Sequence, residues 1–155
     1  MTDPDFQFGD ASLTVADENS SLAYFYASEG MVVAPDKMIT MPDAEINIEI
    51  SSTLLSELQK AASVLGVNDL VLSSDGNVIK LDVTDKKNPT SNTFSRIVGE
   101  GNGSTYTMNF KIENLKVLDG NYRVAVSSKG ISNFVNTDIE LEHFIALEPD
   151  SNYNA

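Results

Sequence analysis

Cysteine is absent from this chain of 155 residues, and histidine occurs once, as His143. Without cysteine, disulfide bonds, thiolate zinc sites and cysteine nucleophiles are excluded. A single histidine also excludes a metal site built from several histidines of one chain. His143 lies in an alternating stretch between Glu142 and Phe144, a setting in which a structural or surface histidine is far more common than a catalytic one.

Positive charge is scarce. The chain has 10 Lys and Arg against 23 Asp and Glu, which gives a net charge of −13. This balance excludes electrostatic binding of nucleic acid over the whole protein surface, so any DNA contact has to be local. No hydrophobic run approaches the ~20 residues of a membrane span. Because the first five residues lack a basic and an apolar region, we expect no signal peptide and no membrane association.

Three features resemble catalytic or metal-binding motifs, but the neighbouring sequence or the spacing does not match what each motif requires. The glycine-rich stretch Gly99–Gly103 leads into an alternating strand at 105–112, whereas a phosphate loop needs a following helix. The spacing of Asp75, Asp82 and Asp85 matches no twelve-residue calcium loop. The serines have no base partner that the sequence identifies. We therefore expect a protein that is not an enzyme and holds no metal and no cofactor.

A change in composition divides the chain near Asp43. Residues 1–43 contain eight acidic residues and one basic residue, Lys37. Pro35 and Pro42 bracket a short stretch that suits an extended connector, because proline lacks an amide donor. We expect residues 1–43 to be the last strands of a truncated first domain plus the connector, and residues 44–155 to be a complete second domain.

The second part contains two similar strand–helix–three-strand units. Glu45–Ile50 alternates as a strand, Ser51 offers a helix N-cap, and apolar residues at helical spacing run to Leu65, before Gly66. Strands are expected next at 69–73, 78–83 and 93–98, the first two joined by an Asp-Gly turn. The second unit predicts a strand at 105–112, a short helix at 113–118, and strands at 122–127, 131–136 and 139–147.

Residues 1–43 predict three strands without a helix, at Phe6–Phe8, Leu13–Val15 and Leu22–Tyr26. Three strands with one uncovered face make a poor independent domain. The missing structure is therefore expected to come from elsewhere.

These duplicated units, the proline-flanked connector and the acidic charge resemble the DNA sliding clamps, above all the trimeric polymerase clamp of T-even-type phages. Gly120–Val124 and Phe144–Ser151 carry the resemblance best. Asp75–Asn77 also fits, as does Asn109–Phe110 together with Leu115–Lys116. The first 43 residues resemble the end of the first clamp domain, whose helices are absent.

The resemblance implies an α+β DNA clamp fold, mostly antiparallel sheet with helices on one face. It also implies a homotrimeric ring that encloses duplex DNA without reading its sequence. The implied partners are a replicative DNA polymerase and a clamp loader, in the cytoplasm of an infected bacterium. Two alternatives stay open: an acidic β-rich phage structural or assembly protein, and a processivity factor that binds DNA as a monomer.

Three groups of residues are the candidate sites under this resemblance. Basic residues expected to face DNA are Lys60, Lys116, Lys111 and Arg123. A groove for an apolar partner peptide is expected from Val33, Met38, Ile39, Met41, Ile145, Leu147 and Pro149. The contact between subunits is expected to use Tyr24, Phe25 and Tyr26 of one subunit and Phe94, Arg96 and Ile97 of the next.

Overall fold

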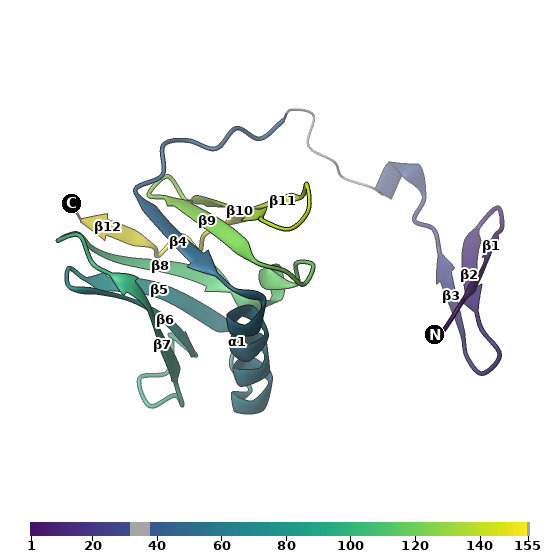
Figure 1. Ribbon diagram of the computed structural model, residues 1–155, viewed down its shortest axis with the longest axis horizontal. Coiled ribbons are helices and arrows are strands. Elements are labelled where there is room, and N and C mark those ends of the chain that lie inside the picture. Colours follow the sequence, from purple (N-terminus) through teal and green to yellow (C-terminus); the bar gives the residue numbers. More distant parts are fainter. Residues whose placement is uncertain (32–37, 155) are drawn as a thin grey trace. The chain divides into compact units, whose positions relative to one another are not determined.

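The computed structural model describes residues 1–31 and 38–154, which belong to two compact units, Met1–Met38 and Ile39–Ala155 (Figure 1). The division falls between Pro35 and Pro42, in the stretch that the sequence identified as a connector. That residues 1–43 are the end of a first clamp domain stays a prediction. No helix of the described residues is long and apolar enough to cross a membrane.

The larger unit contains one α-helix, one 3-10 turn and nine strands within the described residues. In chain order these are β4 (Ile46–Ile50), α1 (Ser52–Leu65), β5 (Asp69–Asp75), β6 (Val78–Thr84), β7 (Phe94–Glu100), β8 (Thr105–Lys111), η2 (Ile112–Leu115), β9 (Tyr122–Ser127), β10 (Ile131–Asn136), β11 (Glu142–Ala146) and β12 (Asn152–Asn154). The strands form two antiparallel sheets, ordered β11-β10-β9-β4 and β12-β8-β5-β6-β7.

The two repeats exchange their first strands. β4, from the first repeat, pairs with β9, and β8, from the second repeat, pairs with β5. Each three-stranded meander therefore receives a fourth antiparallel strand from the other repeat. The duplication is thus built into one sandwich and not into two separate lobes.

Helix α1 is bounded by two capping residues, Ser51 at its start and Gly66 at its end. The Oγ of Ser51 accepts a hydrogen bond from the amide of Leu54 at 3.2 Å, which satisfies one of the free donors at a helix start. Gly66 ends the helix in the left-handed region at φ 67°, a conformation that costs glycine no side-chain clash. Leu55, Leu58 and Ala62 lie on the buried face.

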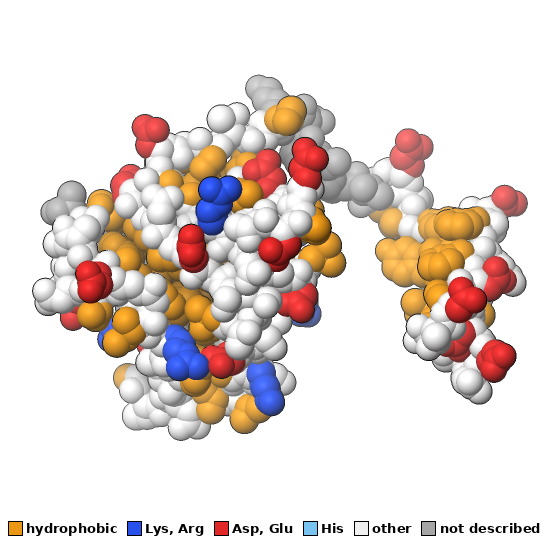
Figure 2. Space-filling model, viewed as in Figure 1, with side chains coloured by type: hydrophobic (Ala, Val, Ile, Leu, Met, Phe, Trp, Pro, Cys, Tyr) orange, Lys and Arg blue, Asp and Glu red, His pale blue; other side chains and the backbone are white. Residues whose placement is uncertain are grey.

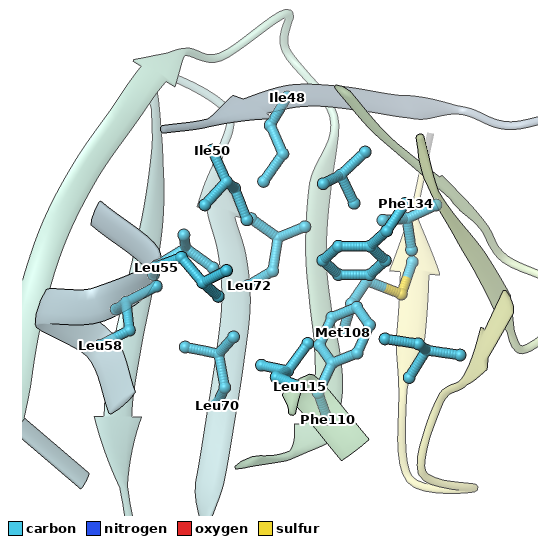
Figure 3. Close-up of a cluster of buried hydrophobic side chains, with 14 of the residues drawn as sticks. Ile48, Ile50, Leu55, Leu58, Leu70, Leu72, Met108, Phe110, Leu115 and Phe134 are labelled. Carbon is cyan, nitrogen blue, oxygen red and sulfur yellow. The ribbon is translucent and has the colours of Figure 1, made fainter. Parts of the chain in front are cut away.

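The core lies between the two sheets, and α1 closes one end of it (Figures 1 and 3). Strict alternation along β4 buries Ile46, Ile48 and Ile50 and leaves the residues between them exposed. Figure 3 shows Leu55 and Leu58 of α1 pointing toward Leu70 and Leu72 of β5. The largest side chains pack edge to face across the sandwich, as Phe110 and Phe134 do at 6.3 Å and 90°.

The short helix expected at 113–118 is only the single 3-10 turn η2, so the prediction that Lys116 lies on a helix is wrong. The stretch between β8 and Gly120 is too short to recover the cost of starting an α-helix, and no side chain caps the turn. Two contacts hold it: Leu115 is buried, and the amide group of Gln59 donates to the Leu115 carbonyl at 2.8 Å.

The end of the chain also differs from the expected strand at 139–147. β11 starts only at Glu142, because Asn136 Oδ1 accepts hydrogen bonds from the amides of Asp138 and Ile139 and turns the chain. β12 was not predicted. It pairs with β8, and Tyr153 stacks on Tyr106 at 5.8 Å.

The smaller unit is the three-stranded antiparallel meander that the sequence predicts, with β1 (Asp5–Phe8), β2 (Ser12–Ala16) and β3 (Ser21–Phe25) in that order. Asp17 forms the second turn by accepting hydrogen bonds from Asn19 and Ser20. A 3-10 turn, η1 (Glu29–Met31), follows.

Candidate functional site

The exposed face of α1 is almost free of negative charge in a chain of net charge −13. Ser56, Lys60 and Ser63 are exposed on it. The one acidic residue of the helix, Glu57, is paired with Arg96 of β7 at 2.5 Å between Oε2 and Nη2. Within residues 1–31 and 38–154, Lys60 has no ion-pair partner, so its charge is available to an anion.

Lys116 lies beside the same helix although it is distant in sequence. A groove of about 630 Å³ runs between α1 and η2 and is lined by Gln59, Ser63, Ile112 and Lys116, among others. The hydrogen bond from Gln59 to η2 fixes the spacing of the two elements. Lys60 lines a different hollow, between α1 and β7, together with Glu57 and Arg96. The two lysines therefore flank α1 and lie in separate hollows.

Lys111 is engaged within the protein. Its ammonium donates to Asp69 Oδ1, and Asp69 is only 3% exposed. This hydrogen bond raises the pKa of Lys111 above its ordinary value. A side chain held by a buried carboxylate is poorly placed to bind a phosphate, and Lys111 is a structural residue in this arrangement.

Arg123 is exposed on the side of β9 that faces away from the core. Glu49 stands opposite it in the β4–β9 register. Glu100 lines the same hollow of about 550 Å³ as Glu49 and Arg123, beside β4 and β7. These two carboxylates oppose the approach of a phosphate. Of the four basic candidates, Lys60 and Lys116 are thus the best suited to contact DNA.

The predicted groove for a partner peptide is not formed as expected. Ile145 and Leu147 are only 5% and 8% exposed and belong to the hydrophobic core. The prediction that they rim an exposed groove is wrong, because alternation along β11 turns Ile145 inward. After β11 the Leu147 amide donates a hydrogen bond to the carbonyl of Gly130, and the Leu147 side chain is buried.

The other residues of that prediction are spread over the connector and the chain end. Met38 and Ile39 are exposed, Met41 is half-buried and Pro149 is exposed. Val33 lies outside the described residues. The exposed apolar surface in this group is therefore limited, among described residues, to the connector and Pro149.

The residues predicted for the contact between subunits lie on two open sheet edges. β3 is the last strand of its sheet, and β7 is the last strand of the five-stranded sheet. Tyr24, Phe25, Tyr26 and Ile97 are exposed on these strands or next to them. Phe94 is half-buried against the core, and the Arg96 guanidinium lies 5.9 Å from its ring.

Sequence reasoning missed the pair formed by Asp69 and Lys111. The two residues are 42 positions apart, so the pairing has no local signature. The one local signal at Asp69 is its position directly before the apolar run Leu70–Leu72. Among residues 1–31 and 38–154, no group of three or more His, Asp or Glu side chains is placed to hold a metal ion.

Comparison with known proteins gives a consistent set of relatives. The family model described as "gp45 sliding clamp, C terminal" matches residues 47–149. The sliding clamp of Vibrio phage KVP40 is 29% identical over 142 residues, which cover 88% of this chain and 63% of that protein. The sliding clamp of Enterobacteria phage T4 is 26% identical over 153 residues, which cover 96% of this chain and 67% of that protein.

Among solved structures, the beta sliding clamp of Caulobacter crescentus superposes with a TM-score of 0.55 at 11% identity, over 94% of this chain and 40% of that one. At this identity the likeness concerns the fold alone. The chain spans about two thirds of the length of the two phage relatives.

Proposed function

This chain belongs to the gp45 sliding clamp family, and from that membership we propose that it is part of a ring that encloses duplex DNA and tethers a DNA polymerase. The fold is that of the clamps, as the sequence predicts. The single observation that supports DNA contact most directly is the face around α1. Lys60 and Lys116 lie in the hollows on either side of this helix, in a protein of net charge −13.

A ring needs only weak contacts to the DNA that it encloses, because its topology prevents dissociation. A few lysines that touch phosphates without reading bases hold the duplex loosely and allow sliding. An acidic surface elsewhere limits non-specific binding of DNA to the outside. The proposed role therefore requires no catalytic group, and we propose that the protein has no enzymatic activity.

Because the chain has no cysteine, single-cysteine variants test the DNA contact without background labelling. A thiol-attached photocrosslinker at Lys60→Cys or Lys116→Cys is expected to react with circular duplex DNA inside assembled rings. Lys129→Cys is the matched control, because it is an exposed lysine in the turn after β9, at the opposite end of β4 from α1. Equal crosslinking at all three positions would contradict the proposal.

We propose that subunits associate through the open edges of β3 and β7. Such a head-to-tail contact closes into a ring when the rotation is right. Analytical ultracentrifugation over a range of concentrations is expected to show self-association of the native chain. The variant with Phe25→Lys and Ile97→Lys is expected to stay monomeric. Self-association of equal strength in both would exclude these strands.

We propose that the polymerase contacts the apolar connector residues Ile39 and Met41. The supporting observation is that Ile39 and its neighbour Met38 are both apolar and exposed. Ile39→Asp is expected to weaken polymerase binding by at least about tenfold, since a central apolar contact often carries that much affinity. Ile139→Asp, a change of another exposed isoleucine, serves as the control, and surface plasmon resonance measures both. Equal affinities for the two variants would place the contact elsewhere.

A further inference from the structure

The groove between α1 and η2 differs from other hollows of the larger unit in its charge. Its volume is about 630 Å³, and none of the described residues that line it is acidic. Four other hollows each have at least one glutamate in their lining, such as Glu49 beside β4 and Glu57 beside β7. Figure 2 shows red acidic side chains scattered over the larger unit, with few blue basic ones between them. In a chain with 23 acidic residues, this groove is therefore suited to an anionic ligand.

The groove is open because only a short element lies beside α1. η2 is a single 3-10 turn of four residues, and the hydrogen bond from Gln59 to the Leu115 carbonyl attaches it to the helix. After this turn the chain continues through Lys116 and Val117 without helical structure, and both residues line the groove. The space beside the second half of α1 is therefore not filled by the chain's own side chains.

The groove combines an apolar floor with a polar rim. Its apolar lining residues are all buried or half-buried: Ala62, Val67, Ile112 and Val117. Ser63, Asn68 and Lys116 also line it and are exposed. A hollow of this size, with apolar walls and a few polar groups, is typical of a site for a small organic group.

Lys116 supplies the positive charge of the groove. Its ammonium group has no ion-pair partner among residues 1–31 and 38–154. The nearest acidic residues along the chain, Glu113 and Asp119, are exposed and do not line the groove. A phosphate bound to Lys116 therefore has apolar surface beside it, and the phosphate itself gains nothing from that surface.

We propose that this groove binds an unpaired nucleotide of single-stranded DNA, with a phosphate on Lys116 and the base on the apolar floor. In a duplex the bases are stacked inside, so the contacts outside the grooves are to phosphates and sugars and leave the floor without a partner. The base of a single strand can leave its neighbours and lie against side chains. Ser63 and Asn68 offer hydrogen bonds to its edge.

This inference rests on the proposed DNA contact and adds the form of DNA that one side of α1 prefers. An acidic peptide with apolar residues is the competing occupant, because it also combines negative charge with apolar surface. The position of the groove beside the helix that carries Lys60 favours DNA. The two occupants are separated by the test.

The test measures binding of the full chain to a fluorescent single strand of about twelve nucleotides, and to the duplex of the same sequence, by fluorescence anisotropy. Phosphate contacts alone favour the duplex, because its charge density is higher. We expect the single strand to bind at least about threefold more tightly, since the base adds its own contact. A strand of the same length without bases keeps the phosphates and is expected to bind at least about threefold more weakly than the intact strand.

Two glutamate variants locate the contact. Ser63→Glu places a carboxylate in the groove and is expected to remove the preference for the single strand. Ser56→Glu is the matched control, because Ser56 is exposed on the same helix and does not line the groove. It is expected to weaken binding of both forms of DNA by the same factor and to leave the preference unchanged.

Several results would overturn the proposal. They are equal or tighter binding of the duplex, equal binding of the strand without bases, and the same loss of preference in both glutamate variants. Displacement of the single strand by an equimolar peptide of alternating Glu and Leu would make an acidic peptide the occupant. Loss of duplex crosslinking in assembled rings, with the single-strand preference intact, would affect only the proposed function.

Discussion

Lys111→Met is expected to lower the free energy of unfolding by about 3 kcal/mol, the low end of the cost of breaking a buried ion pair. The change removes the ammonium group that donates a hydrogen bond to the buried carboxylate of Asp69. The Lys86 amide still donates to the other carboxylate oxygen at 3.1 Å, and Lys111 itself is about one quarter exposed. Both facts argue against the upper end of the range. Urea unfolding measures the difference.

The double variant Lys111→Met with Asp69→Asn is the control for the buried charge. It removes both charges, so most of the lost stability is expected to return. If the double variant is as unstable as Lys111→Met, the loss comes from packing and not from the unpaired carboxylate.

The pH dependence of this effect has a defined sign. The pKa of Lys111 is raised, mainly by the hydrogen bond to Asp69. Its stabilising contribution is therefore fully present below the unfolded pKa of about 10.4, and it is lost as the pH rises through the higher folded value. The difference between native protein and Lys111→Met is expected to be constant from about pH 6 to 9 and to shrink only in strongly alkaline solution.

Leu58→Ala is expected to lower the free energy of unfolding by about 2–5 kcal/mol, because it leaves a cavity under α1. Leu58 is 1% exposed and points toward the side chains of β5 (Figure 3). Val64→Ala on the same helix is the matched control. Val64 is 77% exposed, so its truncation is expected to change stability by less than about 0.5 kcal/mol.

This second prediction connects the core to the proposed function. Lys60 takes its position from α1, and the groove beside Lys116 has α1 as one wall. A helix held less firmly is expected to weaken DNA crosslinking from Lys60→Cys and to leave self-association through β3 and β7 unchanged. Equal loss of both activities would show general unfolding and not a local effect on α1.

Much of the secondary structure was readable from local patterns. Alternation at Ile46, Ile48 and Ile50 and the caps Ser51 and Gly66 predicted β4 and α1 correctly, because these signals act within a few residues. The short helix predicted at 113–118 was wrong, because local signals do not decide the conformation of so short a stretch. Contacts with α1 and the core decide it instead.

The sequence by itself determined most of the strand ranges, helix α1, the repeat, the lack of cysteine chemistry and the scarcity of positive charge. All of these follow from composition and from neighbours along the chain. Only the tertiary structure decided that the repeats exchange β4 and β8, that Lys111 serves a buried Asp69, and that Ile145 and Leu147 belong to the core. These outcomes depend on which residues meet across the sandwich, and a local pattern carries no information about a partner 42 positions away.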